Sequence, residues 1–376
     1  MNSWLNSPPI GPGSAAIGIA FSANLLTLFF FYELMTFSTW PLVTHSKTAE
    51  ARRSGRIYLG ILLGSSTLLL LTAIIWTWII TGTLDFSPGG ILASSDATPG
   101  QISMLIVLFF FGAGKSAIFP LHQWLPRAMV APTPVSALLH AVAVVKAGVF
   151  TVLKIATSVI GTDLLIGNWG AEVVAWTAAF TILLASLIAL TRQQLKERLA
   201  YSTISQLNYI VLGAVVAFPA AIEGASLHIA MHAFGKITLF FAAGAIYVAS
   251  RKTSVDEMAG IGRRMPWTMT AFLIGTVSVI GLPPMCGMWS KWLLAEGMIA
   301  AHQWAFLGAL LLSSLLSIAY LMPIALRAFF AAESEGSSEH GEAPWICRIP
   351  LLLSAAACLV LFLWPGVFAR LAGMVG

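Results

Sequence analysis

Hydrophobic residues along the chain form long uninterrupted runs instead of the apolar–polar alternation of half-buried strands. A helix needs about 20 apolar residues to cross a bilayer, and only helices and closed barrels satisfy their backbone hydrogen bonds there. Because the runs lack a period of two, a barrel is excluded and an all-α polytopic membrane bundle is predicted. About ten transmembrane helices are expected, at residues 17–43, 57–80, 103–124, 134–157, 172–191, 199–220, 225–249, 268–299, 304–330 and 348–370.

The composition of the 376 residues supports a membrane protein. Hydrophobic residues make up 58% of the chain and charged residues 9%, against about 25% charged residues in soluble domains. This composition excludes a water-soluble fold, a disordered chain, a secreted disulfide scaffold and a nucleic-acid-binding domain. The cysteines Cys286, Cys347 and Cys358 are far apart and form no CxxC pair, so no metal knuckle or iron–sulfur cluster is predicted.

Basic residues predict how the chain lies in the membrane. Most of the 20 Lys and Arg residues lie in or beside alternate connections, and the opposite connections carry none. The positive-inside rule makes the basic side cytoplasmic and leaves both termini external, as expected in a prokaryotic cytoplasmic (inner) membrane. The expected divisions are an external segment at 1–14, a transmembrane domain at 15–330, a cytoplasmic loop at 331–347 and a C-terminal transmembrane helix at 348–376.

A small set of ionisable residues lies inside the predicted spans. A charge at the centre of a membrane helix costs roughly 2.5–3.5 kcal/mol on insertion scales, so paired acids, water or neutralisation must offset it. A buried lysine near an acid can gain and lose a proton, which is the physical requirement for a proton relay. The candidate relay residues are Glu33, Lys115, His140, Lys146, His228, His232, Lys236 and Lys291.

Spacing and helix breakers strengthen part of this set. His228, His232 and Lys236 follow one another at intervals of four, which places them on one stripe of a helix. Lys115 and Lys291 lie near prolines, which cannot continue the hydrogen-bond ladder of a helix. Broken helices at membrane depth are tolerated where they line a cavity, and in transporters they mark ion sites. The predicted breaks lie at Pro120, Pro283 and Pro284.

Some of these features also have plainer interpretations. Lys154 lies near the expected external end of its span, where a long side chain reaches the headgroups. A membrane histidine such as His140 is often an interhelical hydrogen-bonding partner. The residues Gly112 to Ser116 resemble the end of a phosphate-binding loop, but Phe109 stands where that motif requires glycine. Nucleotide binding is therefore not predicted.

Four long blocks surround the candidate residues: FGAGKSAIFPLHQWLPRAMVAPTPVSALLHAVAVVKAGVF (111–150), LKERLAYSTISQLNYIVLGA (195–214), HIAMHAFGKITLFFAAGAIY (228–247) and GIGRRMPWTMTAFLIGTVSVIGLPPMCGMWSKWLL (260–294). In this order they resemble the antiporter-like membrane subunits of respiratory complex I, membrane-bound hydrogenases and multisubunit Mrp sodium/proton antiporters. The resemblance covers about residues 15–330. It implies an inverted-repeat bundle with two broken helices and a line of ionisable residues in the bilayer midplane.

The resemblance also implies roles for the candidate residues. Glu33 matches the family's glutamate on its fifth helix, and Lys115 matches the partner lysine on the broken seventh helix. His140 and Lys146 match eighth-helix positions that lead to the central axis. Lys291 matches the terminal lysine of the broken twelfth helix, and a lysine there fits the Mrp D-type or the complex I L- and N-type subunits better than the M-type. The eleventh-helix relay is matched by His228, His232 and Lys236.

The function predicted first is translocation of protons, or exchange of sodium for protons, by a subunit of an Mrp-type antiporter. The reason is that the segment KITLFFAAGAIY resembles the D-type subunit of that antiporter more than the other subunit types. The alternative is a proton-pumping subunit of a complex I-like NADH:quinone oxidoreductase or of a membrane-bound hydrogenase. A scaffold that has lost transport is a third interpretation. In the relay hypothesis, a proton passes from Lys115 through Lys146 and the His232/Lys236 seam to Lys291.

The expected partners are the lipid bilayer and other membrane subunits of a hetero-oligomeric complex. The chain begins just before the fifth helix of the family, so the family's N-terminal helices are expected to be missing, and a partner subunit is one way to supply them. No catalytic redox site, cofactor, metal or nucleic acid is predicted for this chain, and any redox cofactor would lie on a partner.

Overall fold

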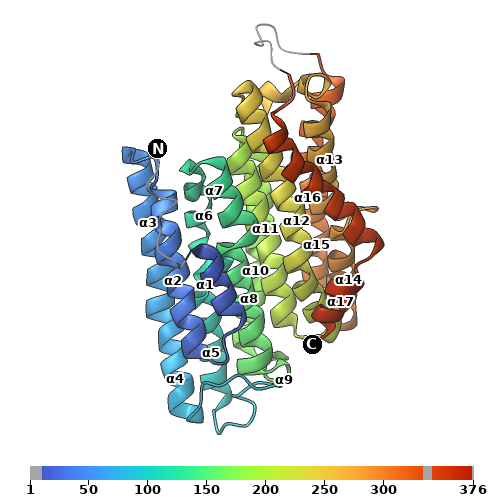
Figure 1. The fold of residues 1–376 in the computed structure, drawn as a ribbon. Helices are drawn as coiled ribbons and strands as arrows, with labels where there is room; N and C mark the ends of the chain where they lie inside the picture. Colours follow the sequence, from blue (N-terminus) through green and yellow to red (C-terminus); the bar gives the residue numbers. More distant parts are fainter. Residues whose placement is uncertain (1–10, 333–340, 375–376) are drawn as a thin grey trace.

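The computed structural model describes residues 11–332 and 341–374 of the chain, and its regular elements are helices apart from two isolated β-bridges. Figure 1 shows them as one elongated bundle. The α-helices are α1 (Pro12–Ala20), α2 (Leu25–Val43), α3 (Ala49–Ser65), α4 (Leu71–Thr81), α5 (Pro99–Gly112), α6 (Trp124–Arg127), α7 (Thr133–Ala137), α8 (Val144–Ile155), α9 (Thr162–Leu165), α10 (Trp169–Thr191), α11 (Leu195–Val216), α12 (Pro219–Ser250), α13 (Pro266–Ile280), α14 (Gly287–Ala300), α15 (Trp304–Phe330), α16 (Trp345–Leu363) and α17 (Gly366–Gly373).

The helical class predicted from the sequence is confirmed, and each of the ten expected regions contains a helix. Eight helical stretches of the described chain are long and apolar enough to cross a membrane. Two of them are continuous through π-helical turns: α3 joins α4 through Ser66–Leu70, and α7 joins α8 through Leu138–Val142. The remaining two expected spans contain the shorter apolar helices α5 and α13, which end before the predicted proline breaks.

The first and last expected spans were predicted as single helices, and this was wrong. The region 17–43 is divided between α1 and α2 because Asn24 starts a new helix, where its side chain accepts a hydrogen bond from the Thr27 N–H at 2.8 Å. The region 348–370 is divided between α16 and α17 near Pro365, which has no N–H to donate. Within the expected segments 1–14 and 331–347, residues 1–10 and 333–340 lie outside the described residues, and α1 and α16 begin in the described parts.

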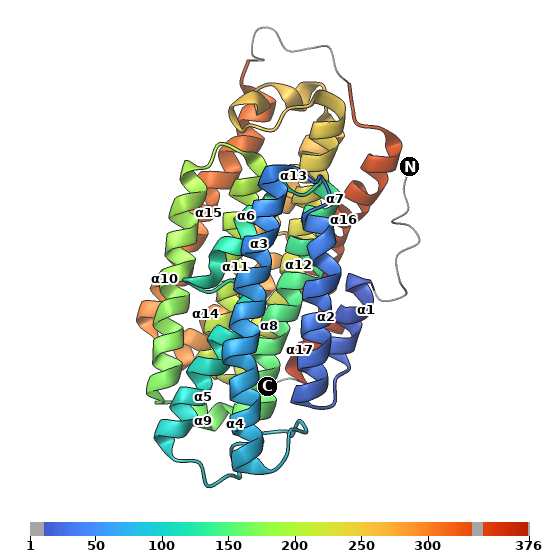
Figure 2. The ribbon, with the colours of Figure 1, turned by 90° about the vertical axis from the view of Figure 1, so that its left-hand side faces the viewer.

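The connections between helices gather at two ends of the bundle. The connections from α10 to α11 and from α12 to α13 lie at the upper end in Figure 1, and the connection from α4 to α5 lies at the lower end with α9 (Figures 1 and 2). The basic connections of the sequence analysis are those of the upper end, whereas residues 82–98 and 161–168 contain no Lys or Arg. One end of the bundle is therefore basic, as the positive-inside argument requires, while the side of the membrane that it faces stays a prediction.

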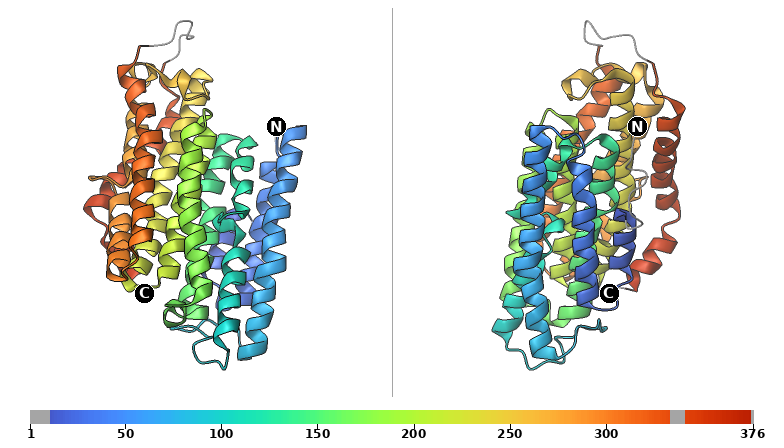
Figure 3. Two further views of the ribbon diagram at one scale, coloured as in Figure 1. Left: turned by 180° about the vertical axis from the view of Figure 1, so that it is seen from behind. Right: turned by 60° about the vertical axis from the view of Figure 1, so that its left-hand side comes forward.

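The longest helix, α12, lies at the centre of the second half of the bundle. It packs against α11, α13, α14 and α16. Figure 1 and the left view of Figure 3 place α2, α3 and α4 at one edge and α13, α14 and α15 toward the other, with α8 and α11 between them. The polar residues His228, His232 and Lys236 of α12 are thus buried among the surrounding helices.

Candidate functional site

The first helix interruption carries Lys115. Helix α5 ends at Gly112, and Lys115 lies in a short 3₁₀ turn that is completely buried. Helix α8 packs directly on this turn at Gly148, where an added Cβ would overlap the backbone of Lys115 and Ser116. Pro120 lies in the same interruption, between the turn and α6. Glycine on α8 therefore permits the close approach that buries Lys115 against the centre of the bundle.

The ammonium group of Lys115 binds α2 through Tyr32. Lys115 Nζ donates to the Tyr32 carbonyl at 2.9 Å and lies 3.2 Å from the centre of its ring. Glu33 is the next residue of α2, but both of its carboxylate oxygens are buried and have no hydrogen-bond partner in the described chain. The expected pair of charges is therefore close in the fold, with a backbone carbonyl and an aromatic face in direct contact with the lysine instead of the carboxylate.

Lys146 joins α8 to the histidines of α12. Its Nζ lies 2.6 Å from His232 Nδ1, and the His232 ring stacks on that of His228 with ring centres 5.5 Å apart. His228 Nδ1 lies 2.8 Å from the Ser290 hydroxyl on α14. These contacts form a continuous polar connection from α8 through α12 to the residue that precedes Lys291.

The second interruption carries Lys291. Helix α13 ends at Ile280 and is capped by Gly281, whose φ of +89° favours glycine. Helix α14 begins at Gly287, and Pro283 and Pro284 lie between the two helices. Lys291 Nζ donates to the Ile280 carbonyl at 2.9 Å and to the Ser314 hydroxyl at 3.2 Å. The carbonyl at the broken end of α13 thus has a cationic partner, as expected for the negative end of a helix dipole.

Tyr209 of α11 lies between the histidines and Lys291. Its ring centre is 5.7 Å from that of His228 and 4.9 Å from Lys291 Nζ. Its hydroxyl is 3.4 Å from Ser314, the hydroxyl that Lys291 also binds. Sequence reasoning missed this residue, although it follows Ser202 and Ser205 at helical spacing inside an otherwise apolar helix.

Lys236, on the same α12 stripe, connects to a chain of hydroxyl groups. Its Nζ donates to Ser202 Oγ at 2.7 Å, which also accepts from the Tyr320 hydroxyl at 3.1 Å. Tyr320 in turn lies 2.9 Å from Ser317 Oγ. We name these four residues, Lys236, Ser202, Tyr320 and Ser317, the hydroxyl branch. All of them are buried.

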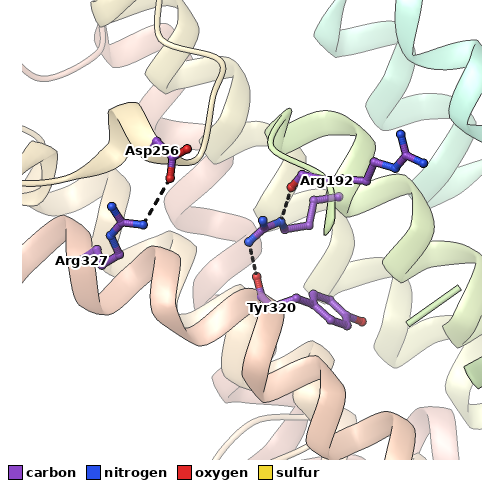
Figure 4. Close-up of polar contacts among 5 residues, drawn as sticks. Arg192, Asp256, Tyr320 and Arg327 are labelled. Carbon is purple, nitrogen blue, oxygen red and sulfur yellow. Dashed lines mark hydrogen bonds and ion pairs between the residues drawn. The ribbon is translucent and has the colours of Figure 1, made fainter. Parts of the chain in front are cut away.

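Arg198 binds the part of α15 that supplies Tyr320. Its guanidinium donates to the Arg192 carbonyl at 2.8 Å and to the Tyr320 carbonyl at 3.1 Å (Figure 4). Figure 4 also shows the ion pair of Arg327 with Asp256 at 3.4 Å, which ties α15 to the α12–α13 connection. These contacts restrain α15 against α11, so that the Tyr320 hydroxyl stays beside Ser202.

His140 is separate from these contacts. It lies on the π-helical turn that leads into α8, is completely buried, and has its ring centre 5.3 Å from that of Phe240. Neither ring nitrogen has a hydrogen-bond partner among the described residues. The structure places His140 beside α12 but not in the polar chain that contains Lys146. The relay roles of all the candidate residues stay predictions.

Two buried stretches of polar atoms are not directly joined. Lys115 lies on the 3₁₀ turn and Lys146 on α8, which packs on that turn, and no hydrogen bond of the described chain links the two lysines. Ser116 Oγ of the turn, Thr151 Oγ1 of α8 and both side-chain polar atoms of Gln206 on α11 are buried without a hydrogen-bond partner among the described residues. Buried polar atoms of this kind commonly bind ordered water. The described residues contain no cluster of three or more His, Cys, Asp or Glu able to hold a metal ion.

Comparison with known proteins connects this arrangement to a family. Residues 22–317 match the family described as "NADH:quinone oxidoreductase/Mrp antiporter, TM". The chain is 35% identical over 296 residues to NAD(P)H-quinone oxidoreductase chain 5 of a Picosynechococcus species, covering 74% of this chain and 43% of that protein. It is 32% identical over 317 residues to NADH-quinone oxidoreductase subunit N of Desulforudis audaxviator, covering 83% of this chain and 62% of that protein. The chain thus spans only part of the length of these relatives.

Solved structures share the fold over nearly the whole chain. A chain of the archaeal membrane-bound sulfane sulfur reductase matches with a TM-score of 0.85 at 25% identity, covering 97% of this chain and 74% of its own. A chain of the Mrp complex of a Dietzia species also has a TM-score of 0.85, at 20% identity, with coverage of 97% and 76%. Respiratory complex I of Thermus thermophilus gives 0.77 at 21% identity, with coverage of 96% and 78%.

Proposed function

Since this integral membrane chain belongs to the family of NADH:quinone oxidoreductase/Mrp antiporter transmembrane subunits, we propose that it translocates protons as one subunit of a complex I-like, redox-driven membrane complex. The observation that carries the proposal is a row of buried titratable groups, Lys146, His232, His228 and Lys291. Lys146 lies within hydrogen-bond distance of His232, and the rings of His232 and His228 stack. His228 lies within hydrogen-bond distance of Ser290, the residue before Lys291.

A proton enters this scheme at Lys115. The Tyr32 carbonyl and the negative charge of Glu33 stabilise the ammonium form, because both place negative potential near Nζ. When Glu33 is neutralised or turned away, that stabilisation falls and the proton moves on to Lys146. The partnerless oxygens of Glu33 support this role, since no other group of the described chain fixes the carboxylate in place.

From Lys146 the proton reaches Lys291 through the imidazoles. A short contact such as the 2.6 Å between Lys146 and His232 allows transfer without rearrangement of the helices. His228 and Ser290 carry the proton to α14, and Lys291 delivers it to Ser314. Moving one charge through a membrane potential costs about 2.3 kcal/mol per 100 mV, which is within reach of charge changes between neighbouring buried sites.

The relatives support redox coupling over the Mrp-type antiporter that the sequence analysis placed first. Both sequence relatives are quinone oxidoreductase subunits by name, whereas the Mrp structure, at 20% identity, supports the fold alone. The two candidates differ in their partners. Purification of the native complex through a tag on this chain should yield subunits with iron–sulfur clusters in the redox case, and only small membrane subunits in the antiporter case.

Translocation itself is tested with Lys115→Gln, which keeps much of the length of the side chain and removes its titration. The assembled complex is reconstituted in liposomes, a potential is imposed with potassium and valinomycin, and proton flux is followed with a pH-sensitive dye. We expect flux to fall to the level of empty liposomes. Lys154→Gln is the matched control, because Lys154 lies over Phe86, 4.8 Å from the ring centre, outside the row. Wild-type flux in Lys115→Gln would refute the proposal.

A further inference from the structure

A cavity of about 700 Å³ lies between α7, α11, α12 and the start of α16, away from the buried lysine row. Its lining includes Lys252 and Thr253. These residues belong to the connection from α12 to α13, which lies at the basic end of the bundle (Figure 1). Its walls are mainly apolar, with Phe240, Phe241 and Val248 from α12 and Ile346 and Pro350 from α16. Its polar lining includes two lysines, Lys196 and Lys252.

Lys252 is the unusual member of this lining. Its Nζ is buried and has no hydrogen-bond partner in the described chain. A buried ammonium group without a hydrogen-bond partner is destabilising, because nothing replaces the hydrogen bonds of its lost hydration. None of the described residues that line the cavity is acidic. The described lining therefore supplies no anion to Lys252.

The second lysine adds positive charge at the same place. Lys196 Nζ donates to the carbonyls of Met129 at 2.8 Å and Ala131 at 2.6 Å, which hold it at the cavity wall. Two neutral carbonyls orient this ammonium group without cancelling its charge. A ligand that enters the cavity thus meets two cationic groups, one of them fixed in place.

Glu257, the acid near Lys252, binds backbone N–H groups instead of the lysine. The Glu257 carboxylate accepts hydrogen bonds from the backbone N–H groups of Ser254 at 2.8 Å and Thr253 at 3.0 Å. These two bonds, with a smaller contribution from Lys252, hold the pKa of Glu257 below its ordinary value. The carboxylate is ionised at neutral pH, closes the loop after α12 and does not form an ion pair with Lys252.

The surroundings of the cavity resemble the boundary between lipid tails and headgroups. Ile346 is 83% exposed, and Trp345 beside it is also exposed and carries Arg348 over its ring at 3.8 Å. Exposed aromatic and basic residues at a helix end mark the membrane interface. A molecule that enters here therefore presents a headgroup to the lysines and hydrocarbon to α12 and α16.

We propose that this cavity binds the headgroup of an anionic phospholipid, with its phosphate facing Lys252 and Lys196 and its acyl chains along Phe241, Val248 and Ile346. The occupant is chosen by charge complementarity: the described lining is cationic and apolar and contains no acid. A zwitterionic lipid would bring a second positive group to the lysines and would bind more weakly. The site has no part in the proposed proton path.

The proposal is tested by lipid retention. The native complex is exchanged into vesicles of phosphatidylcholine with an equal share of phosphatidylglycerol, repurified in mild detergent, and its bound lipids are measured by native mass spectrometry. We expect phosphatidylglycerol to be retained preferentially, and Lys252→Gln to reduce that retention about fivefold, the effect of one lysine near an anionic surface. Lys154→Gln, at the other end of the bundle, should leave it unchanged.

Cys347 offers a second readout, because it lines the cavity and is a free thiol, while Cys286 and Cys358 are buried. Maleimide labelling of Cys347 should be slower in vesicles with phosphatidylglycerol than in pure phosphatidylcholine, and Lys252→Gln should remove the difference. Three results would overturn the proposal. The first is equal retention of both lipids, and the second is that inorganic phosphate protects Cys347 from maleimide as well as phosphatidylglycerol does. The third is that a partner subunit, and not lipid, is cross-linked at Cys347. Proton flux is not the readout, so this result is independent of the translocation test.

Discussion

Lys115 and Lys291 have similar immediate surroundings in the two halves of the bundle. Each follows an interrupted helix, each Nζ donates to a backbone carbonyl at 2.9 Å, and each lies over a tyrosine ring, Tyr32 in one case and Tyr209 in the other. They differ in their other neighbours. Lys115 binds α2 at Tyr32, and the next residue of α2 is the carboxylate Glu33. Lys291 instead binds the Ser314 hydroxyl of α15.

We infer from this difference that the two lysine sites have different roles in proton transfer. A carboxylate beside an ammonium group holds the proton and releases it when the acid changes state. A hydroxyl group both donates and accepts, so it transmits a proton without storing charge. On this account the Lys115 region is the controlled holding site and the Lys291 region is the conducting site.

The two interruptions should tolerate substitution differently. Gly148→Ala pushes a Cβ into the backbone of Lys115 and Ser116, which cannot move aside, and should lower the free energy of unfolding by about 2–3 kcal/mol. Gly281→Ala meets mainly the flexible methylenes of Lys291 and the strain of a positive φ, about 1–2 kcal/mol. Thermal unfolding of the purified complex measures both, with Gly308→Ala as the control, since nothing lies within 4 Å of its Cβ position. Equal shifts at Gly148 and Gly281 would contradict the contrast.

Proton flux should depend on the carboxylate of Glu33, which lies at the Lys115 site. Glu33→Gln keeps the shape of the side chain and removes the charge beside Lys115, so proton flux should fall about tenfold, which corresponds to about 1.4 kcal/mol of lost charge interaction. Glu33→Asp keeps the charge and should retain most of the flux. Flux of Glu33→Gln within about twofold of the wild type, well short of that factor, would remove Glu33 from the account.

The hydroxyl branch should make a smaller contribution. Tyr320→Phe removes the hydroxyl that joins Ser202 to Ser317, and we expect flux to fall about fivefold, which corresponds to the loss of one hydrogen bond of about 1 kcal/mol. Tyr58→Phe is the matched control: its hydroxyl is equally buried and bonded, to Thr39 at 2.6 Å, but it belongs to α3 and lies outside the hydroxyl branch. If both variants lose the same flux, the effect is structural and the branch carries no protons.

Much of the fold was predictable because long apolar runs leave few alternatives in a membrane. The runs gave the helices, and the prolines marked where α5 and α13 end. The short helices α1 and α17 were missed because their apolar residues continue those of the adjacent span, and only the cap at Asn24 and the missing N–H of Pro365 separate them.

The charged residues of the site could be predicted from the sequence because a charge inside a membrane span has a high free-energy cost. The hydroxyl groups could not be predicted in this way. Most buried Ser and Thr side chains of this molecule donate to the carbonyl four residues earlier, as Thr77 does to Ala73 at 2.8 Å. Sequence cannot distinguish such a residue from Ser202 or Ser314, whose partners come from other helices. The contact of Lys115 with the Tyr32 carbonyl was also beyond reach, because it depends on the packing of α2 against a 3₁₀ turn.

The most direct test of the account is made at Lys146, the residue of α8 that contacts His232 and so links the two halves. Proton flux of the reconstituted complex carrying Lys146→Gln is compared with the wild type under an imposed membrane potential, after thermal unfolding and subunit content have shown that the complex is intact. We predict flux no greater than that of empty liposomes, because an amide side chain cannot take up or release a proton at the 2.6 Å contact. An intact complex with wild-type flux would contradict the claim that protons pass between the two halves through this contact.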